Sequence, residues 1–205
     1  MNPDEVRDDW AEREGEFSPR YYAHKGPDDT SEALLSAIEF YVGADARVLE
    51  LGCGSGRHLE HLRRNGFDRL AGVDINDESF DVMAETFPEL AETGEFHTGA
   101  IEDLLPEFAD DAFDAVYSVE TLQHVHPDDA WVFEEVVRVA GDLLVSVENE
   151  GNGAERGRDG AEVSYVNDEF PLYHRNWKEV FSPLGGVQVV KEPTKRDTIR
   201  AFKLS

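Results

Sequence analysis

Residues 48–62 read Val-Leu-Glu-Leu-Gly-Cys-Gly-Ser-Gly-Arg-His-Leu-Glu-His-Leu, and this stretch decides the fold. A short apolar strand carries an acidic residue near its end, turns through three alternating glycines and continues into a helix. In an open α/β sheet, this order places a nucleoside ligand at the carboxyl end of the first strand. The glycines let the backbone approach the ligand closely, and the start of the helix points free N–H groups at its negative end.

The spacing of the glycines distinguishes between classes of ligand. Dinucleotide-binding loops follow G-x-G-x-x-G, and Arg57 occupies the position of their third glycine. The pattern, with Glu50 just ahead of the loop, closely resembles the first motif of class I S-adenosylmethionine-dependent methyltransferases. The resemblance implies that S-adenosylmethionine is the cosubstrate and that Glu50 contacts it. The loop residues implied to bind it are Gly52, Cys53, Gly54, Ser55 and Gly56.

Strand and helix patterns alternate from about residue 30 to the end of the sequence, which favours a doubly wound α/β sheet. The expected strands are 47–51, 70–75, 95–98, 113–119, 142–147, 187–191 and 197–204. Helices are expected at 31–42, from the glycine loop to about residue 65, after the second strand, after Pro127 and at 174–181. The family resemblance implies a single Rossmann-like sheet of seven strands, mostly parallel, with an antiparallel C-terminal strand. Residues 30–205 then form the cofactor-binding domain, and residues 1–29 form a lid or a tail.

An acidic residue at the end of the second strand, about twenty residues beyond the glycines, is typical of a group that binds ribose hydroxyls. Asp74 occupies this position and Ile75 follows it. Alone, such an acid is more often a helix cap or a solvated strand end. Its spacing from the glycine loop favours the ribose role.

The resemblance extends to two further segments. Residues 99–104 correspond to the adenine-binding segment, where Ala100 replaces an aspartate found in many relatives. Ile101 and Glu102 are therefore expected at the adenine, with Asp103 as the rival acceptor for its amine. Val119, at the end of the fourth strand, is expected beneath the sulfonium.

The residues after the fourth strand are expected to face the methyl group. His124 is the best-placed titrating group there, since histidine titrates near neutral pH. It is either a general base or a histidine held by a backbone hydrogen bond. Glu120 is the second catalytic candidate, because a carboxylate there is able to hold a cationic substrate or the cofactor's amine.

The chain is strongly acidic, with 45 Asp and Glu against 19 Lys and Arg, which gives a formal charge of −26. The acids are spread along the whole chain, and this haloarchaeal-type composition resembles proteins of salt-accumulating halophiles. The alternative is a low-salt protein with an acidic partner-binding face. No basic stripe is visible, so a nucleic-acid substrate is not expected. A single cysteine, the absence of a long apolar stretch and an N-terminus without signal-peptide character favour a cytoplasmic protein without membrane association.

Folding is expected to depend on salt. Lowering the ionic strength from 1 M to 0.1 M lengthens the screening distance from about 3 Å to about 10 Å, so carboxylates repel over a longer range. The melting temperature should therefore rise as potassium chloride increases from roughly 0.1 M to several molar. Thermal denaturation across that series checks this, and a flat or falling curve contradicts the halophilic interpretation.

The histidines and two segments near the C-terminal end of the sequence also bear on the site. The seven histidines do not combine with carboxylates at ligand spacing, so no metal is expected. Residues 149–160 are glycine-rich and charged, which predicts a mobile loop. Residues 165–181 mix aromatic and polar groups and either line a substrate pocket or pack on the sheet.

The sequence therefore predicts an S-adenosylmethionine-dependent methyltransferase that acts on an unidentified acceptor, with a small molecule favoured because no appended recognition module is visible. One alternative is a non-catalytic S-adenosylmethionine-binding partner or regulatory protein. A nicotinamide-dependent oxidoreductase is disfavoured by Arg57. Neither the methylated atom nor the oligomeric state follows from the sequence.

Overall fold

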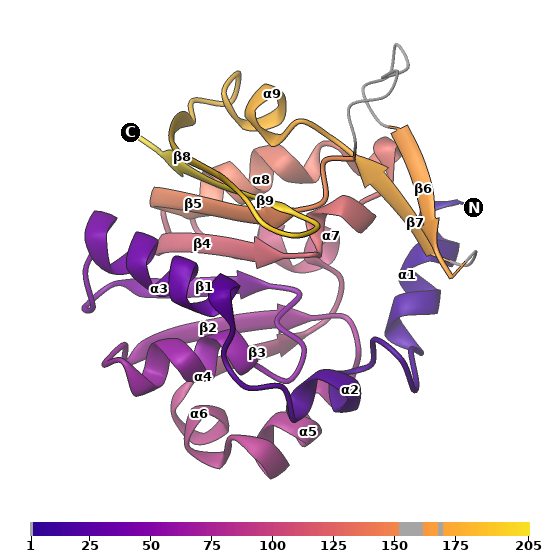
Figure 1. Cartoon of the computed structure of the whole chain (residues 1–205), viewed down its shortest axis with the longest axis vertical. Coiled ribbons are helices and arrows are strands. Elements are labelled where there is room, and N and C mark those ends of the chain that lie inside the picture. The colour runs from indigo at the N-terminus through magenta and orange to yellow at the C-terminus, as the bar shows by residue number, and fades with distance from the viewer. Residues whose placement is uncertain (1, 152–161, 168–169) are drawn as a thin grey trace.

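The computed structural model describes residues 2–151, 162–167 and 170–205, and a seven-stranded sheet forms its centre (Figure 1). The strand order is β3-β2-β1-β4-β5-β9-β8. The strands are β1 (Arg47–Leu51), β2 (Arg69–Asp74), β3 (Glu95–Thr98), β4 (Phe113–Val119), β5 (Ala140–Glu148), β8 (Val187–Pro193) and β9 (Thr198–Lys203). All seven predicted strands are present. The first five pair in parallel and β9 is antiparallel to both of its neighbours, so the predicted fold class is confirmed.

Helices cover both faces of the sheet, as expected for strands that are apolar on both sides. One face packs against α3 (Asp29–Tyr41), α4 (Arg57–Arg64), α5 (Glu78–Thr86) and α6 (Pro88–Thr93). The other face packs against α7 (Ile101–Leu104), α8 (Val132–Val139) and α9 (Trp177–Phe181). The chain order reverses between β1 and β4, and in sheets of this type the crevice at that point is where ligands bind.

Local sequence explains where helices α3 and α4 begin. Asp28 caps α3, since its carboxylate accepts from the Ser31 backbone N–H while the Asp28 N–H donates to the Ser31 hydroxyl oxygen. Gly56 has a φ of 80° at the start of α4. A Cβ atom on this glycine would lie 2.7 Å from Met83 and 2.9 Å from Leu90, so glycine is needed both for the turn and for close packing.

The segment between β5 and β9 differs from the prediction. Strands β6 (Glu162–Val166) and β7 (Phe170–His174) form a separate antiparallel hairpin that the sequence did not reveal. The helix expected at 174–181 begins only at Trp177, because Asn176 caps it and His174 belongs to β7. The loop expected at 149–160 falls largely outside the described residues.

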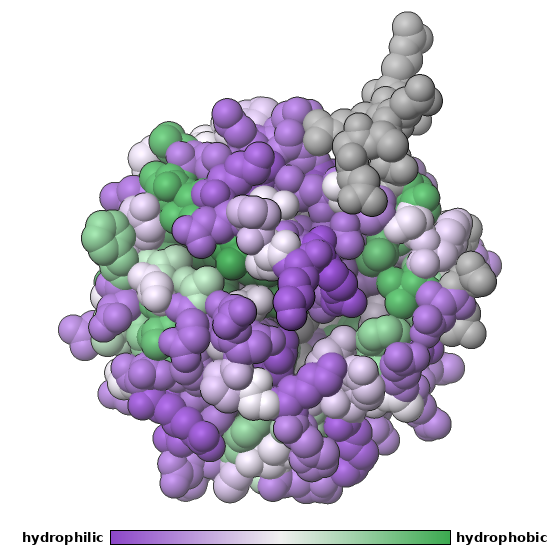
Figure 2. Space-filling model, viewed as in Figure 1, coloured by the Kyte–Doolittle hydropathy of each residue, from purple (hydrophilic) through white to green (hydrophobic). Residues whose placement is uncertain are grey.

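The N-terminal segment folds as two short helices, α1 (Pro3–Ala11) and α2 (Pro19–Ala23). Helix α1 contacts β7, and α2 contacts α5, so the segment reaches across the carboxyl end of the sheet (Figure 1). Whether it acts as a lid or as a tail stays a prediction. Hydrophilic side chains cover most of the face shown in Figure 2, as the charge of −26 requires. None of the described helices is long and apolar enough to cross a membrane.

Candidate active site

A cavity of about 300 Å³ opens at the carboxyl ends of β1, β2 and β4, at the point where the strand order reverses. Its walls come from the glycine loop, the strand ends, helices α1 and α2, the β6–β7 hairpin and the turn between β8 and β9. The predicted site residues on these walls are Glu50, Gly52, Cys53, Gly54, Ser55, Asp74, Ile75, Ile101, Glu102, Val119, Glu120 and His124. Only Gly56 among the predicted residues is not on the wall, because it faces α5 and α6 instead.

The glycine loop is held against the end of β2. The backbone N–H groups of Gly52 and Cys53 donate to the Val73 carbonyl at 2.9 and 3.0 Å. Gly52 has a φ of 67°, and a Cβ atom there would lie 2.2 Å from the Thr121 hydroxyl oxygen. The loop therefore keeps its shape only with glycine at this position. The Ser55 hydroxyl is buried on the cavity wall and has no hydrogen-bond partner among the described residues.

Asp74 joins the glycine loop to the segment after β2. Its carboxylate accepts from the Gly54 N–H at 2.7 Å, the Asn76 N–H at 2.9 Å and the Ser79 hydroxyl at 2.8 Å. Burial raises the pKa of Asp74, and these three donors oppose that shift. A carboxylate has about four acceptor sites, so one remains for a ligand hydroxyl.

Asn76 continues this connection into the N-terminal helices. Its side-chain amide donates to the carbonyls of Arg13 at 3.0 Å and Trp10 at 3.4 Å. Asn76 is 5% exposed, so these bonds are largely shielded from water. The segment after β2 and helix α1 are therefore linked directly.

Glu50 is a buried carboxyl group on the cavity wall. The Tyr117 hydroxyl donates to it at 2.9 Å. Burial raises the pKa of Glu50 to about 8, although the hydrogen bond from Tyr117 and the charge of Arg57 oppose the shift. Glu50 is therefore largely protonated at neutral pH until a cation approaches it.

The two candidate acceptors for the adenine lie in different surroundings. Glu102 is 8% exposed and lies on the wall, where burial raises its pKa. Asp103 is exposed and absent from the wall. The geometry favours Glu102.

Glu148, which the sequence analysis missed, fixes the loop after β4. Its carboxylate accepts from the backbone N–H groups of Thr121, Leu122 and Gln123 and from the Ser118 hydroxyl at 2.6 Å. Burial raises the pKa of Glu148 to about 7 against these four bonds. The acid was not recognisable in the sequence, since its partners lie about 26 residues away along the chain.

His124 contacts the N-terminal segment and the hairpin. Its Nδ1 atom lies 3.0 Å from the Pro171 carbonyl, and its ring centroid is 4.5 Å from that of Trp10. Burial lowers the pKa of His124 to about 4, opposed by the bond to Pro171. The ring is therefore neutral at pH 7. With Nδ1–H donating to the carbonyl, Nε2 is left as a hydrogen-bond acceptor.

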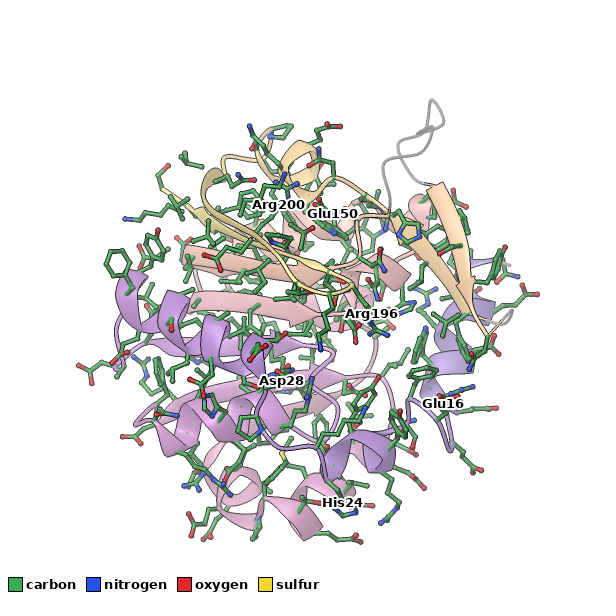
Figure 3. All side chains as sticks on the ribbon, viewed as in Figure 1. Glu16, His24, Asp28, Glu150, Arg196 and Arg200 are labelled. Carbon is green, nitrogen blue, oxygen red and sulfur yellow. The ribbon has the colours of Figure 1, made fainter. Side chains whose placement is uncertain are left out.

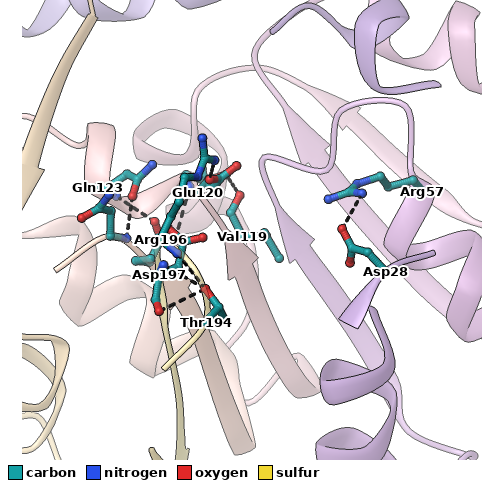
Figure 4. Close-up of polar contacts among 11 residues, drawn as sticks. Asp28, Arg57, Val119, Glu120, Gln123, Thr194, Arg196 and Asp197 are labelled. Carbon is teal, nitrogen blue, oxygen red and sulfur yellow. Dashed lines mark hydrogen bonds and ion pairs between the residues drawn. The ribbon is translucent and has the colours of Figure 1, made fainter. Parts of the chain in front are cut away.

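Glu120 lies on the cavity wall and has a left-handed backbone, with a φ of 51°. Its carboxylate pairs with Arg196 in the β8–β9 turn (Figure 4). Thr194 holds this turn by bonds to the Asp197 backbone at 2.8 and 2.9 Å. Glu120 thus has a cationic partner before any ligand binds.

The sequence analysis also missed most of the wall opposite the glycine loop. These residues come from the N-terminal helices, the hairpin and the β8–β9 turn. They are Val6, Arg7, Trp10, Arg13, Phe17, Pro19, Tyr22, Val166, Leu172 and Arg196. The sequence carried two signals for this wall. Residues 1–29 contain Trp10, Phe17, Tyr21 and Tyr22 and were expected to form a lid or a tail, and residues 165–181, which include Val166 and Leu172, were a candidate lining of a substrate pocket. In residues 2–151, 162–167 and 170–205, no group of three His, Cys, Asp or Glu side chains is placed to hold a metal.

Replacing Asp74 with Ala should weaken S-adenosylhomocysteine binding by roughly 1.5–3 kcal/mol, the value of a charged hydrogen bond. Glu102→Ala should weaken it more than Asp103→Ala, because only Glu102 lies on the wall. Calorimetry on the three variants measures both effects. A larger loss for Asp103→Ala would show that Glu102 is not the adenine acceptor.

Comparison with known proteins finds similarity to methyltransferases. Residues 49–142 match the model of a methyltransferase domain. The ubiquinone biosynthesis O-methyltransferase of Xylella fastidiosa is 31% identical over 141 residues, which cover 65% of this chain and 56% of that protein. The chain therefore spans little more than half the length of this relative.

Two solved structures share the fold over the whole chain. The 1,6-didemethyltoxoflavin-N1-methyltransferase of Burkholderia thailandensis has a TM-score of 0.74 at 15% identity and is covered over 91% of its length. The magnesium protoporphyrin IX methyltransferase of Synechocystis PCC 6803 has a TM-score of 0.70 at 14% identity and is covered over 100%. At these identities the likeness concerns the fold.

Proposed function

Because the chain belongs to the class I S-adenosylmethionine-dependent methyltransferases, we propose that it transfers the methyl group of S-adenosylmethionine to a small-molecule acceptor and releases S-adenosylhomocysteine. One observation carries the proposal. The residues assigned to the cofactor and a largely apolar wall from residues 6–22 and the hairpin enclose the same cavity.

The chain's own residues fit this cofactor. Asp74 retains an acceptor site for a ribose hydroxyl, Glu102 is a buried acceptor for an adenine amine, and Glu50 is a carboxyl group able to meet an ammonium. When bound, S-adenosylmethionine supplies an electrophilic methyl group, so the protein's task is to align the acceptor and exclude water.

His124 fits an orienting role better than that of a strong base. With a pKa of about 4, it does not retain a proton at neutral pH. Its neutral Nε2 is able to accept a hydrogen bond from an acceptor hydroxyl and so direct an oxygen lone pair towards the methyl group. Glu148 supports this role by fixing the backbone at residues 121–123.

The lid is part of the same proposal. Residues 1–29 contribute Val6, Trp10, Phe17 and Tyr22 to the cavity, and removing them would open it to solvent. Excluding water while still admitting a substrate requires an element that moves. Gly15, with a φ of 71°, and Phe17, with a φ of 68°, lie between α1 and α2 and form the candidate hinge.

Two measurements test the function. Calorimetry in high salt should show S-adenosylmethionine and S-adenosylhomocysteine binding with dissociation constants of roughly tens of micromolar or less, and tighter NADH binding would overturn the assignment. Incubation with methyl-labelled cofactor and a fractionated extract should then label a small molecule. Cofactor binding without a labelled product would favour the non-catalytic regulatory alternative.

Cofactor affinity should also depend on pH. The pKa of Glu50 is about 8 in the free protein, and a bound ammonium would lower it, so binding releases a proton. The affinity for S-adenosylhomocysteine should therefore rise between pH 6 and pH 8 and level off above the free-state pKa. Titration calorimetry with wild type and Glu50→Gln measures this. The same slope in both proteins would exclude Glu50 as its source.

A further inference from the structure

Arginines are concentrated at the cavity although the chain is strongly acidic. Four of the 14 arginines line it, namely Arg7, Arg13, Arg57 and Arg196. The acids on the same wall are Glu50, Asp74, Glu102 and Glu120, and the first three belong to the proposed cofactor site. The rest of the wall therefore carries four arginines and one acid, the reverse of the 19 to 45 ratio of the whole chain.

Two of these arginines lie on the side of the glycine loop and the β4 exit. Arg57 begins α4 directly after the loop, and Arg196 reaches the cavity from the β8–β9 turn (Figures 3 and 4). Tyr22 is their common neighbour. The guanidinium carbon of Arg57 is 5.9 Å from the Tyr22 ring centroid. Burial raises the pKa of Tyr22 to about 12, and the positive charges of Arg196 and Arg57 oppose this rise.

Both guanidinium groups have unused donors. Arg57 is 17% exposed, and its one hydrogen bond in the described part of the chain is from Nη1 to Asp28 at 2.9 Å. The Arg196 side chain is 65% exposed, and its guanidinium bonds there only to Glu120, through Nη2. A guanidinium carries five N–H donors in a planar fork that matches the two oxygens of a carboxylate. Most of this capacity is therefore left for a ligand.

The carboxylates that pair with Arg57 and Arg196 leave both arginines able to bind an anion. The Asp28 side chain is 46% exposed, so water screens its charge, whereas Arg57 faces the cavity. Glu120 occupies one donor of Arg196, and Asp197 behind it is not on the wall. Tyr22 lies beside Arg57, and Val166, Leu172 and Phe17 give other parts of the same cavity wall an apolar or aromatic surface.

We propose that Arg57 and Arg196 form a carboxylate-binding subsite beside Tyr22, and that the acceptor is a small acid with an apolar or aromatic body. This inference rests on the proposed function. Arg196 is the specificity-determining residue, since it lies at the β4 exit where the acceptor is expected. The only other source of a carboxylate in the cavity is the amino-acid part of the cofactor.

The experiment uses the full chain saturated with S-adenosylhomocysteine and matched pairs of ring probes. Benzoate, 4-hydroxybenzoate and 2-naphthoate are each compared with the corresponding amide by saturation-transfer NMR at one fixed potassium chloride concentration. At least one acid should bind about tenfold more tightly than its amide. Arg196→Gln and Arg57→Gln should each abolish that preference, whereas Arg20→Gln, which changes an exposed arginine outside the cavity, should leave it intact.

The remaining outcomes overturn the proposal. Equal binding of acids and amides, no binding of any acid up to about 10 mM, or a preference that survives both substitutions would each contradict it. A separate titration identifies the cofactor as the source. 5′-Methylthioadenosine lacks the amino-acid part of the cofactor. If Arg57→Gln weakens the binding of S-adenosylhomocysteine but not that of 5′-methylthioadenosine, the subsite binds the cofactor's own carboxylate and the proposal is wrong. If the wild-type protein does not bind S-adenosylhomocysteine, the proposed function itself is wrong.

Discussion

Deletion of residues 1–26 is expected to lower methyl transfer by roughly a hundredfold or more, the scale for misplaced reacting groups. The deletion removes the wall formed by Val6, Trp10, Phe17 and Tyr22 but leaves Asp28 to cap α3. The sheet and its two apolar cores should therefore remain folded. Label transfer from methyl-labelled S-adenosylmethionine to the extract, with circular dichroism on the same sample, measures both parts.

A point variant provides the control for this deletion. Arg20→Gln alters only an exposed ion pair between α2 and Glu85 and should keep full turnover. If the deletion variant is folded and transfers methyl groups at the wild-type rate, residues 1–29 are a tail. The acceptor pocket would then have to be formed by the hairpin and the β8–β9 turn.

An ion pair between Arg200 and Glu150 joins β9 to the segment just after β5, and breaking it should destabilise the fold strongly. Arg200 is 3% exposed and binds Glu150 through two bonds, at 2.7 and 2.8 Å (Figure 3). Glu150 also accepts from the Trp177 N–H at 3.1 Å. Arg200→Ala should lower the free energy of unfolding by about 3–5 kcal/mol, because it leaves the Glu150 carboxylate, whose side chain is 13% exposed, without its partner. For a chain of this size the melting temperature should fall by about 10 °C.

The matched control removes both charges. The double variant Arg200→Met with Glu150→Gln should recover much of the loss, since no buried charge is left without a partner. Urea denaturation of the three proteins measures the difference. A loss below about 1 kcal/mol in the single variant would show that water reaches the pair and screens it.

The parts of this fold that were predictable are those specified by adjacent residues. The glycine loop, the acid at the end of β2 and the alternation of apolar strands with helices are local patterns, and the structure places them as expected. Gly56 differs from the other predicted loop residues because the structure places it away from the cavity wall. Its left-handed conformation was foreseeable, but its contacts with Met83 and Leu90 depend on how α5 and α6 pack.

The missed features depend on contacts between distant parts of the chain. Glu148 acquires its role because β5 pairs with β4, and Arg196 reaches the cavity because the β8–β9 hairpin returns to the edge of the sheet. The β6–β7 strands are short and contain Pro171, so their sequence resembles a loop more than a sheet. Each of these residues is an ordinary polar or apolar residue until the fold supplies its neighbours.

The bonds from Asn76 to the carbonyls of Arg13 and Trp10 have a thermodynamic consequence. They join the loop assigned to the cofactor to the helix assigned to the acceptor, so occupancy of either region changes the cost of ordering the other. Coupling free energies are reciprocal. In the proposed enzyme, any factor by which the cofactor strengthens acceptor binding is the same factor by which the acceptor strengthens cofactor binding. Methyl transfer would then end with two products whose affinities are linked, and the departure of one would loosen the hold on the other.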